Sequence, residues 1–207
     1  MARKPPTNPR KSASQARSRA TVDALIEATA RILVHDGFEK TSTNRIAEVA
    51  GVSVGSLYQY FPSKEALVAA VIDRHNEEIM GIVRMALIEV ADLPVDKAVR
   101  RLVTVAIEAH RINPKLHRVL AEQIPRTGQL ADVEAFNREV HNLVRTYLES
   151  RRKEMRKIDL DIATFICVST IESVAHNTVL NQAEMLTEKT VKVLVDETTR
   201  MVVGYLR

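Results

Sequence analysis

A serine flanked by two glycines is the first pattern in this 207-residue chain that could carry chemistry. The segment Gly51-Val52-Ser53-Val54-Gly55 matches Gly-x-Ser-x-Gly, in which a strained turn from a strand into a helix exposes a nucleophilic serine. Here the residues before Gly51 have helical spacing, and no segment shows the alternation of polar and apolar residues that a strand requires. Because no sheet supports such a turn, we do not interpret Ser53 as a nucleophile.

Histidine and cysteine are the next candidates, for metal or redox chemistry. No two of the six histidines form a His-Glu-x-x-His pair, and Pro114 separates His110 from His117. The single cysteine, Cys167, excludes an internal disulfide and any zinc or iron–sulfur site built from clustered cysteines. It lies in an apolar segment, which favours a small buried side chain. The sequence therefore predicts no catalytic residue, no metal, no cofactor and no enzyme.

Four polar residues in the second half of the chain are kept as candidates for a ligand pocket. A mostly apolar pocket uses a few converging polar groups to orient its ligand. The candidates are His110, His141, His176 and Asn177.

A run of residues around Gly51 predicts binding. Two short helical segments are expected there, the first carrying Ile46, Ala47, Val49 and Ala50, and the second over Val54–Tyr60. Their small and branched side chains suit the seam of a helix-turn-helix, with Gly51 in the turn. The outer face of the second segment is polar and aromatic, with no acidic residue: Ser53, Val54, Gly55, Ser56, Tyr58, Gln59 and Tyr60. Such a face can enter a DNA major groove.

Positive charge is concentrated at the start of the chain. The first 20 residues contain six Lys and Arg and no acid, and residues 1–75 hold eleven basic against seven acidic residues. The remainder carries nineteen of each, so the net charge of +4 belongs to the first third. Residues 1–16 are either a solvated disordered tail or a flexible arm held near phosphate.

Helical spacing and breakers predict an all-α fold of about nine helices. The first helix begins near Ser18 or Thr21 and ends at Gly37, and a long fourth helix opens at Ser63. Later helices are expected over 94–112, from Asn113-Pro114 to about Gln123, from Leu130 to Met155, over 160–182 and over 187–206, with interruptions at Pro125 and Gly128. No apolar run approaches ~18 residues, and the basic start lacks the apolar segment of a secretory signal. We therefore expect a cytoplasmic protein with no membrane partner.

Residues 41–67 resemble the DNA-binding signature of the TetR/AcrR family of transcriptional regulators. The resemblance is carried by Ile-Ala-x-x-Ala-Gly-Val-Ser from Ile46, Gly-Ser-Leu-Tyr-x-Tyr-Phe from Gly55, and Ser-Lys-Glu-x-Leu from Ser63. The dense match covers residues 20–75. The rest of the chain resembles the family only in the number, length and order of its helices.

The resemblance implies DNA contacts residue by residue. Thr41, Ser42, Thr43 and Asn44 would lie along the DNA backbone, and Ser53 would open the recognition helix. Base edges would face Val54, Gly55, Ser56 and Gln59, with Gln59 paired to adenine. Tyr58 and Tyr60 would reach phosphates or a thymine methyl, and Lys64 would hold a phosphate. Val54 stands where the family often has a polar or charged residue, so fewer direct base contacts are expected from it.

The resemblance also implies a domain organisation. Residues 1–16 form the basic arm, 17–65 the DNA-binding domain with its motif at 41–60, and 66–207 the ligand-binding and dimerisation domain. The last two helices, about 160–182 and 187–206, would pair with those of a second copy. The expected function is that of a homodimeric repressor released from a palindromic double-stranded DNA operator by a small-molecule effector, apolar if the Val-, Leu- and Ile-rich composition of residues 75–180 reflects its pocket.

Two other functions stay open from the residues alone. The chain would be a helical ligand-binding protein without DNA readout if it showed no DNA affinity. It would be a nonspecific DNA binder if it bound every duplex equally, although neutrality beyond residue 75 argues against a wide wrapping surface.

Overall fold

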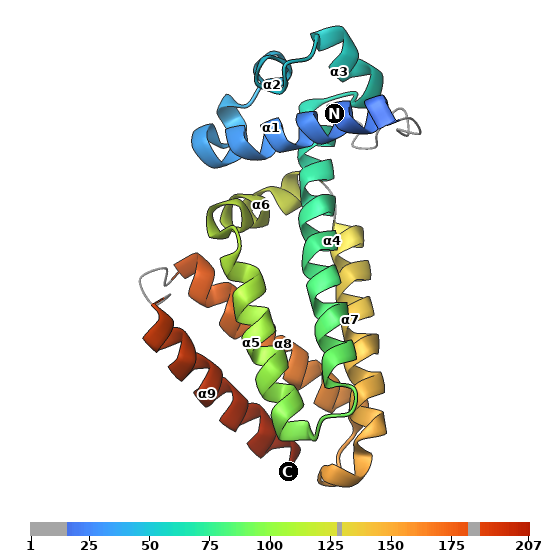
Figure 1. The fold of residues 1–207 in the computed structure, drawn as a ribbon, viewed down its shortest axis with the longest axis vertical. Coiled ribbons are helices and arrows are strands. Elements are labelled where there is room, and N and C mark those ends of the chain that lie inside the picture. The colour runs from blue at the N-terminus through green and yellow to red at the C-terminus, as the bar shows by residue number, and fades with distance from the viewer. Residues whose placement is uncertain (1–15, 128–129, 182–186) are drawn as a thin grey trace. The chain divides into compact units, whose positions relative to one another are not determined.

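The described part of the chain is helical throughout its regular elements (Figure 1). A computed structural model describes residues 16–127, 130–181 and 187–207. These residues form nine α-helices and one short 3-10 turn, so the predicted all-α class and helix number are confirmed. The elements are α1 (Ala16–Lys40), α2 (Thr43–Ala50), α3 (Val54–Tyr60), α4 (Lys64–Val90), α5 (Val95–Arg111), α6 (Pro114–Thr127), α7 (Leu130–Ser150), the turn Arg152–Glu154, α8 (Leu160–Asn181) and α9 (Glu188–Leu206).

The chain packs as two compact units. The first contains the described residues up to Asn76 together with Lys115–Ala131, and the second contains Glu77–Pro114 and Asp132–Arg207. The helix α4 runs from the first unit into the second. By packing, residues 66–76 and 115–131 group with the DNA-binding motif, whereas the functional boundary at residue 65 stays a prediction. The expected arm at 1–16 lies, except for its last residue, outside the described residues.

The first unit has a continuous apolar core. Its fully buried side chains come from α1, α2, α3 and the start of α4, and Leu116 and Leu120 of α6 pack on the same cluster. Apolar residues of α1 recur at helical spacing and are buried at Leu25, Ile26, Ile32 and Leu33, as the sequence predicts. This core holds α2 and α3 in place.

Capping signals in the sequence set the ends of the short helices. The Ser42 hydroxyl accepts a hydrogen bond from the Arg45 amide at 3.3 Å and begins α2. Gly51 ends α2 in the left-handed conformation, φ 67°, and its amide and that of Val52 donate to Glu48 and Ala47. The Ser53 hydroxyl then accepts from the Ser56 amide at 3.1 Å and begins α3.

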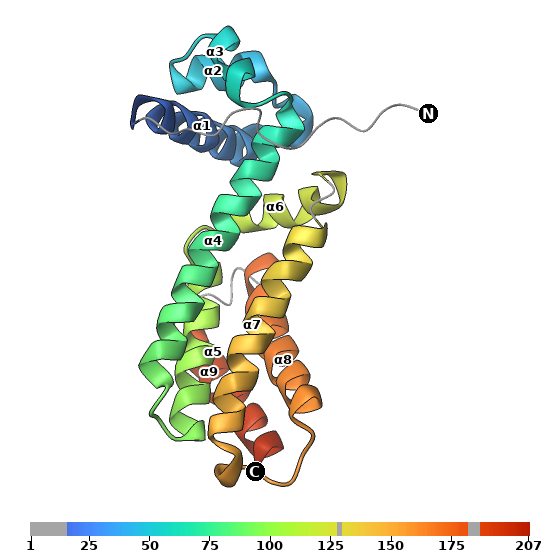
Figure 2. The ribbon, with the colours of Figure 1, turned by 90° about the vertical axis from the view of Figure 1, so that its right-hand side faces the viewer.

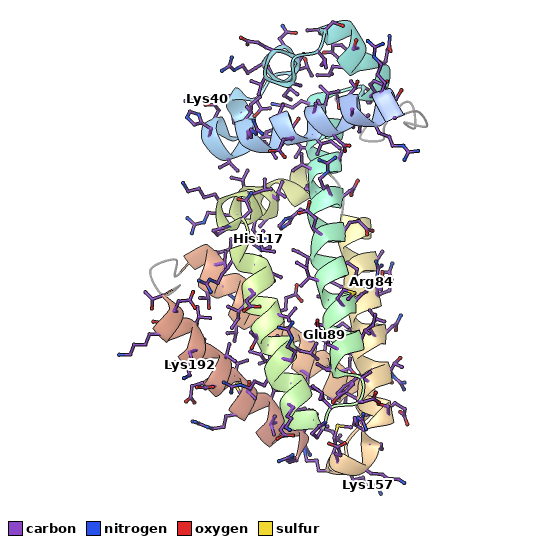
Figure 3. All side chains as sticks on the ribbon, in the orientation of Figure 1. Lys40, Arg84, Glu89, His117, Lys157 and Lys192 are labelled. Carbon is purple, nitrogen blue, oxygen red and sulfur yellow. The ribbon has the colours of Figure 1, made fainter. Side chains whose placement is uncertain are left out.

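The second unit is built from the C-terminal half of α4 with α5, α7, α8 and α9. Their apolar side chains form one cluster, in which α5 packs against both α8 and α9 (Figure 2). Ion pairs join α4 to its neighbours on opposite sides. The Arg84 guanidinium meets Glu139 of α7 at 2.5 Å, and Glu89 meets Arg101 of α5 at 2.8 Å (Figure 3). These pairs are partly exposed, so the apolar cluster contributes most of the stability.

Two predicted boundaries are wrong. Pro125 does not interrupt α6, which continues to Thr127. The stretch expected to run to Met155 ends as α7 at Ser150. The predicted interruption at Gly128 lies outside the described residues.

The segment after α7 leaves the helix because it caps two others. The Glu154 carboxylate accepts from the Val95 amide at 2.9 Å, at the start of α5, where Pro94 offers no side-chain cap. The Arg156 amide donates to the Leu206 carbonyl at 2.9 Å, at the end of α9. One backbone group at each of these helix ends is thereby satisfied by a residue distant in the sequence.

Within the described residues, no helix combines the length and apolar character needed to cross a membrane.

Replacing glycine by alanine should have opposite effects on stability at Gly51 and at Gly81. Gly51→Ala places a Cβ in the left-handed region and should lower the free energy of unfolding by about 1 kcal/mol. Gly81→Ala, inside α4 with open space around the new Cβ, should raise it by about 0.5–1 kcal/mol. Urea midpoints followed by circular dichroism measure both. Shifts in the same direction would contradict the role given to the Gly51 turn.

Candidate nucleic-acid interface

The pair α2 and α3 forms a distinct surface of the first unit. Figures 1 and 2 show α1 between this pair on one side and α6 on the other. The seam between the two short helices is buried, with Ile46, Ala47 and Leu57 almost fully enclosed. The sequence predicted this seam.

The opposite face of α3 is exposed. Ser53, Gly55 and Gln59 are exposed, as are Val54 with 37% and Tyr58 with 40% of their surface. Ser56 is half-buried. On α2, Ser42 before the helix and Asn44 within it are exposed, and Thr43 is half-buried. These residues together offer hydroxyls, amides and apolar groups without an acidic side chain on α3.

Two of the predicted outer residues are buried. Tyr60 is only 7% exposed, because it follows Leu57 by three residues and shares its inward face. Thr41 is 3% exposed, and its hydroxyl donates to the Gly37 carbonyl at 2.7 Å. The prediction that Tyr60 lies on the outer face of α3 is wrong, and both side chains stabilise the unit from within. Because both side chains are buried, neither is available to contact DNA.

Hydrogen bonds fix the orientation of several exposed side chains. The hydroxyl of Tyr58 lies 3.0 Å from the Thr43 hydroxyl and joins α3 to the first turn of α2. The Ser53 and Ser56 hydroxyls are 2.8 Å apart. Each bond holds its side chains in one rotamer before any ligand arrives, which lowers the entropy lost on binding.

The basic residues nearest this surface are engaged by neighbours. The Arg45 guanidinium donates to Glu48 at 2.8 Å, and this bond raises the pKa of Arg45 above its ordinary value. The Lys64 ammonium donates to the Phe38 carbonyl at 3.0 Å and lies 4.0 Å from the centre of the Phe38 ring. Lys64 therefore ties the start of α4 to the end of α1. The ammonium has two further N–H donors, so a contact from Lys64 to a DNA phosphate remains possible and stays a prediction.

The four pocket candidates separate in the structure. His110 and His176 come together in the second unit, with ring centroids 6.0 Å apart in an edge-to-face arrangement. His141 instead lies 6.2 Å from the Phe165 ring, and Phe165 is about 16 Å along α8 from His176 at 1.5 Å per residue. Asn177 is exposed, with its amide donating to the Ser173 carbonyl at 2.8 Å.

The environment of the buried polar groups explains their protonation. The Nδ1 atom of His110 donates to the Ala106 carbonyl at 2.7 Å, and burial lowers the pKa of His110 below its ordinary value, so the ring is neutral. Burial raises the pKa of the Cys167 thiol to about 11, and the predicted buried cysteine is confirmed.

Sequence reasoning missed contacts between distant residues. The bond between Thr43 and Tyr58 and the seat of Lys64 on Phe38 have no signal in local spacing. Within the first unit, Nε2 of His75 lies 3.0 Å from Nδ1 of His117, and this contact joins α4 to α6. Figure 3 labels His117. Because these histidines are 42 positions apart, local sequence spacing could not predict their pairing.

Two family models match the chain. Residues 25–71 match the model described as bacterial regulatory proteins, tetR family. Residues 94–206 match the model described as tetracyclin repressor-like, C-terminal domain.

Individual relatives are similar over part of the chain. Nucleoid occlusion factor SlmA of Actinobacillus pleuropneumoniae serotype 5b is 33% identical over 85 residues, which are 41% of each protein. The HTH-type transcriptional repressor KstR2 of Mycolicibacterium smegmatis is 29% identical over 142 residues, 68% of this chain and 62% of that one. The chain thus spans less than two thirds of these relatives.

A solved structure shows the same fold. A putative TetR-family transcriptional regulator from Mesorhizobium loti MAFF303099 superposes with a TM-score of 0.78 at 17% identity, over 92% of this chain and 98% of that one. At this identity the likeness shows the fold alone.

The contacts between the Lys64 ammonium and Phe38 predict that replacing Lys64 destabilises the protein. Lys64→Met keeps the apolar stem but removes the bond to the Phe38 carbonyl and the charge over its ring, which should lower the free energy of unfolding by about 1–2 kcal/mol. Lys40→Met is the matched control, because Lys40 is exposed in the last turn of α1 (Figure 3). Urea midpoints compare the two, and equal midpoints would contradict the structural role.

Proposed function

This chain belongs to the TetR family of bacterial regulatory proteins, and we propose on that premise that it is a transcriptional repressor controlled by a small molecule. As a homodimer it binds a palindromic operator. The observation that carries the proposal is the exposed face of α3, held by the Gly51 turn and the Ser53 cap and free of acidic residues. The similarity to the repressor KstR2 supports repression, rather than activation, of transcription.

The recognition surface divides between phosphate and base contacts. Ser42, Thr43 and Asn44, at the start of α2, follow the DNA backbone. Along α3, which Ser53 opens, base edges face Val54, Gly55, Ser56 and Gln59, and Tyr58 reaches a phosphate or a thymine methyl. Lys64 adds a phosphate contact through its remaining donors. The phosphate contacts position the protein on the duplex, and the base contacts select the DNA sequence.

The homodimer forms through α8 and α9. Large apolar side chains stand exposed on both helices, Ile162 and Phe165 on α8 and Val193 and Met201 on α9. Exposed apolar groups of this size are typical of protein interfaces. A twofold axis then presents two copies of α3 to successive major grooves, about 34–36 Å apart, which requires a palindromic operator.

An effector in the second unit controls the DNA-binding state. We place it among α5, α7 and α8 of that unit, whose apolar cluster favours an apolar molecule, with the neighbouring His110 and His176 rings as its polar groups. Because α4 continues from the second unit into the first, a change at one end is passed along one helix. The effector thereby selects the form that does not bind DNA.

Operator binding is tested by fluorescence anisotropy with DNA flanking the gene, against a scrambled duplex, over a salt series. We expect at least ~1,000-fold discrimination at physiological salt. Gln59→Ala should weaken operator binding by about 1–3 kcal/mol for each half-site and leave binding to the scrambled duplex unchanged. Asn142→Ala, exposed on α7, is the matched control and should bind as the wild type.

The same titration decides between the other functions. Equal, steeply salt-dependent binding to both duplexes would indicate a nonspecific DNA binder. No binding even at low salt would favour a helical ligand-binding protein without DNA readout.

The interface is tested by a charge on α8. Phe165→Glu, at a side chain 60% exposed in one copy, should weaken dimerisation by about 3–6 kcal/mol, since the twofold axis counts each lost side chain twice. Met85→Glu on α4, 58% exposed, is the control. Sedimentation velocity measures both. A dimer that survives Phe165→Glu and dissociates with Met85→Glu would assign the interface to α4.

A further inference from the structure

We infer that this protein reads A·T base pairs in each operator half-site, through thymine methyl groups and adenine edges. Val54 packs against the C5-methyl of a thymine, and the Gln59 amide pairs with an adenine. The inference rests on the proposed function and names the kind of sequence that the α3 surface selects.

The α3 surface has no side chain suited to guanine. The commonest specific contact to guanine is a bidentate bond from Arg or Lys to O6 and N7. Residues 51–60 contain neither Arg nor Lys. The nearest cations are Arg45, bonded to Glu48, and Lys64, seated on Phe38. Neither cation belongs to α3, so no Arg or Lys of the recognition helix itself can make this contact.

The same surface offers apolar area where a base edge arrives. Val54 and Tyr58 are four residues apart and therefore neighbours on one face of α3, and both are exposed. The Tyr58 hydroxyl is held by Thr43, so its ring presents a fixed side next to the Val54 methyls. In the major groove, thymine is the base that carries a methyl group, and an apolar side chain is its complement.

The polar groups of α3 are unequally available. The Ser53 hydroxyl caps the first turn of α3 and bonds to the Ser56 hydroxyl, so part of the hydrogen-bonding capacity of both is taken up within the helix. The Gln59 amide is exposed and has no hydrogen-bond partner among the residues that the structure describes. Its carbonyl and NH₂ match N6 and N7 of adenine in a bidentate pair.

Gly55 lets the DNA come close. It lies one position after Val54 and four before Gln59, on the exposed side of α3. A Cβ there would meet nothing nearer than the Ser53 hydroxyl at 3.9 Å, so the absent side chain leaves room rather than relieving a clash. A base pair can therefore approach the backbone between the two side chains that read it.

The test removes single groups from the DNA and leaves its pairing intact. A preferred duplex is first selected from a random library with the wild-type dimer. Each thymine is then replaced by deoxyuridine, which lacks only the C5-methyl, and each adenine by 7-deazaadenine, which lacks only N7. Anisotropy titrations give the ratio of affinities for the two duplexes.

We expect one thymine in each half-site at which deoxyuridine weakens binding about 4- to 10-fold, the value of one buried methyl group. At that position Val54→Ala should bind the two duplexes equally. Gln59→Ala should likewise become insensitive to 7-deazaadenine at one adenine. Ile88→Ala, exposed on α4, is the control and should retain the full wild-type ratios.

Failure of the inference is distinct from failure of the proposed function. Selective binding to a half-site in which every deoxyuridine changes the affinity less than twofold, or in which 7-deazaguanine is the damaging replacement, would overturn the inference and leave the regulator intact. Selection of no preferred duplex would overturn both. The deoxyuridine arm uses the wild-type protein, so it holds even where a variant folds poorly.

Discussion

The left-handed turn at Gly51 is the constraint on which the α2–α3 surface depends. Two amides close the end of α2 across this turn, and the Ser53 hydroxyl opens α3 two residues later. The change of direction turns Leu57 into the seam with Ile46 and leaves Val54 and Gln59 outside. A different backbone conformation at this one residue would change the direction in which α3 leaves α2.

Local physics made much of the first unit predictable. Caps, breakers and the periodicity of α1 gave its helix order, the seam at Ile46 and Leu57 and the turn at Gly51, because each depends on neighbours along the chain. The burial of Tyr60 and Thr41 was missed. Tyr60 shares the inward face of Leu57 three residues earlier, and this spacing could have predicted its burial. Thr41 lies between α1 and α2, where no helical spacing indicates which way a side chain points.

The second unit was less predictable because its ends are settled by distant partners. Glu154 and Arg156 cap α5 and α9, so the segment after Ser150 abandons a helix that its own sequence could continue. The four polar candidates for a pocket separated for a similar reason, since helical spacing says nothing about which of five packed helices meet. His110 and His176 come together, whereas His141 meets Phe165. Only tertiary packing distinguishes these pairs.

Burial makes the Cys167 thiol a poor target for oxidants while the protein is folded. With a pKa of about 11, roughly one thiol in ten thousand is a thiolate at pH 7, and the thiolate is the species that peroxides and disulfides attack. The sulfur becomes reactive when α8 leaves the apolar cluster and the thiol meets water. The rate at which an alkylating reagent modifies Cys167 therefore reports how often the second unit opens, and no label has to be engineered into the chain.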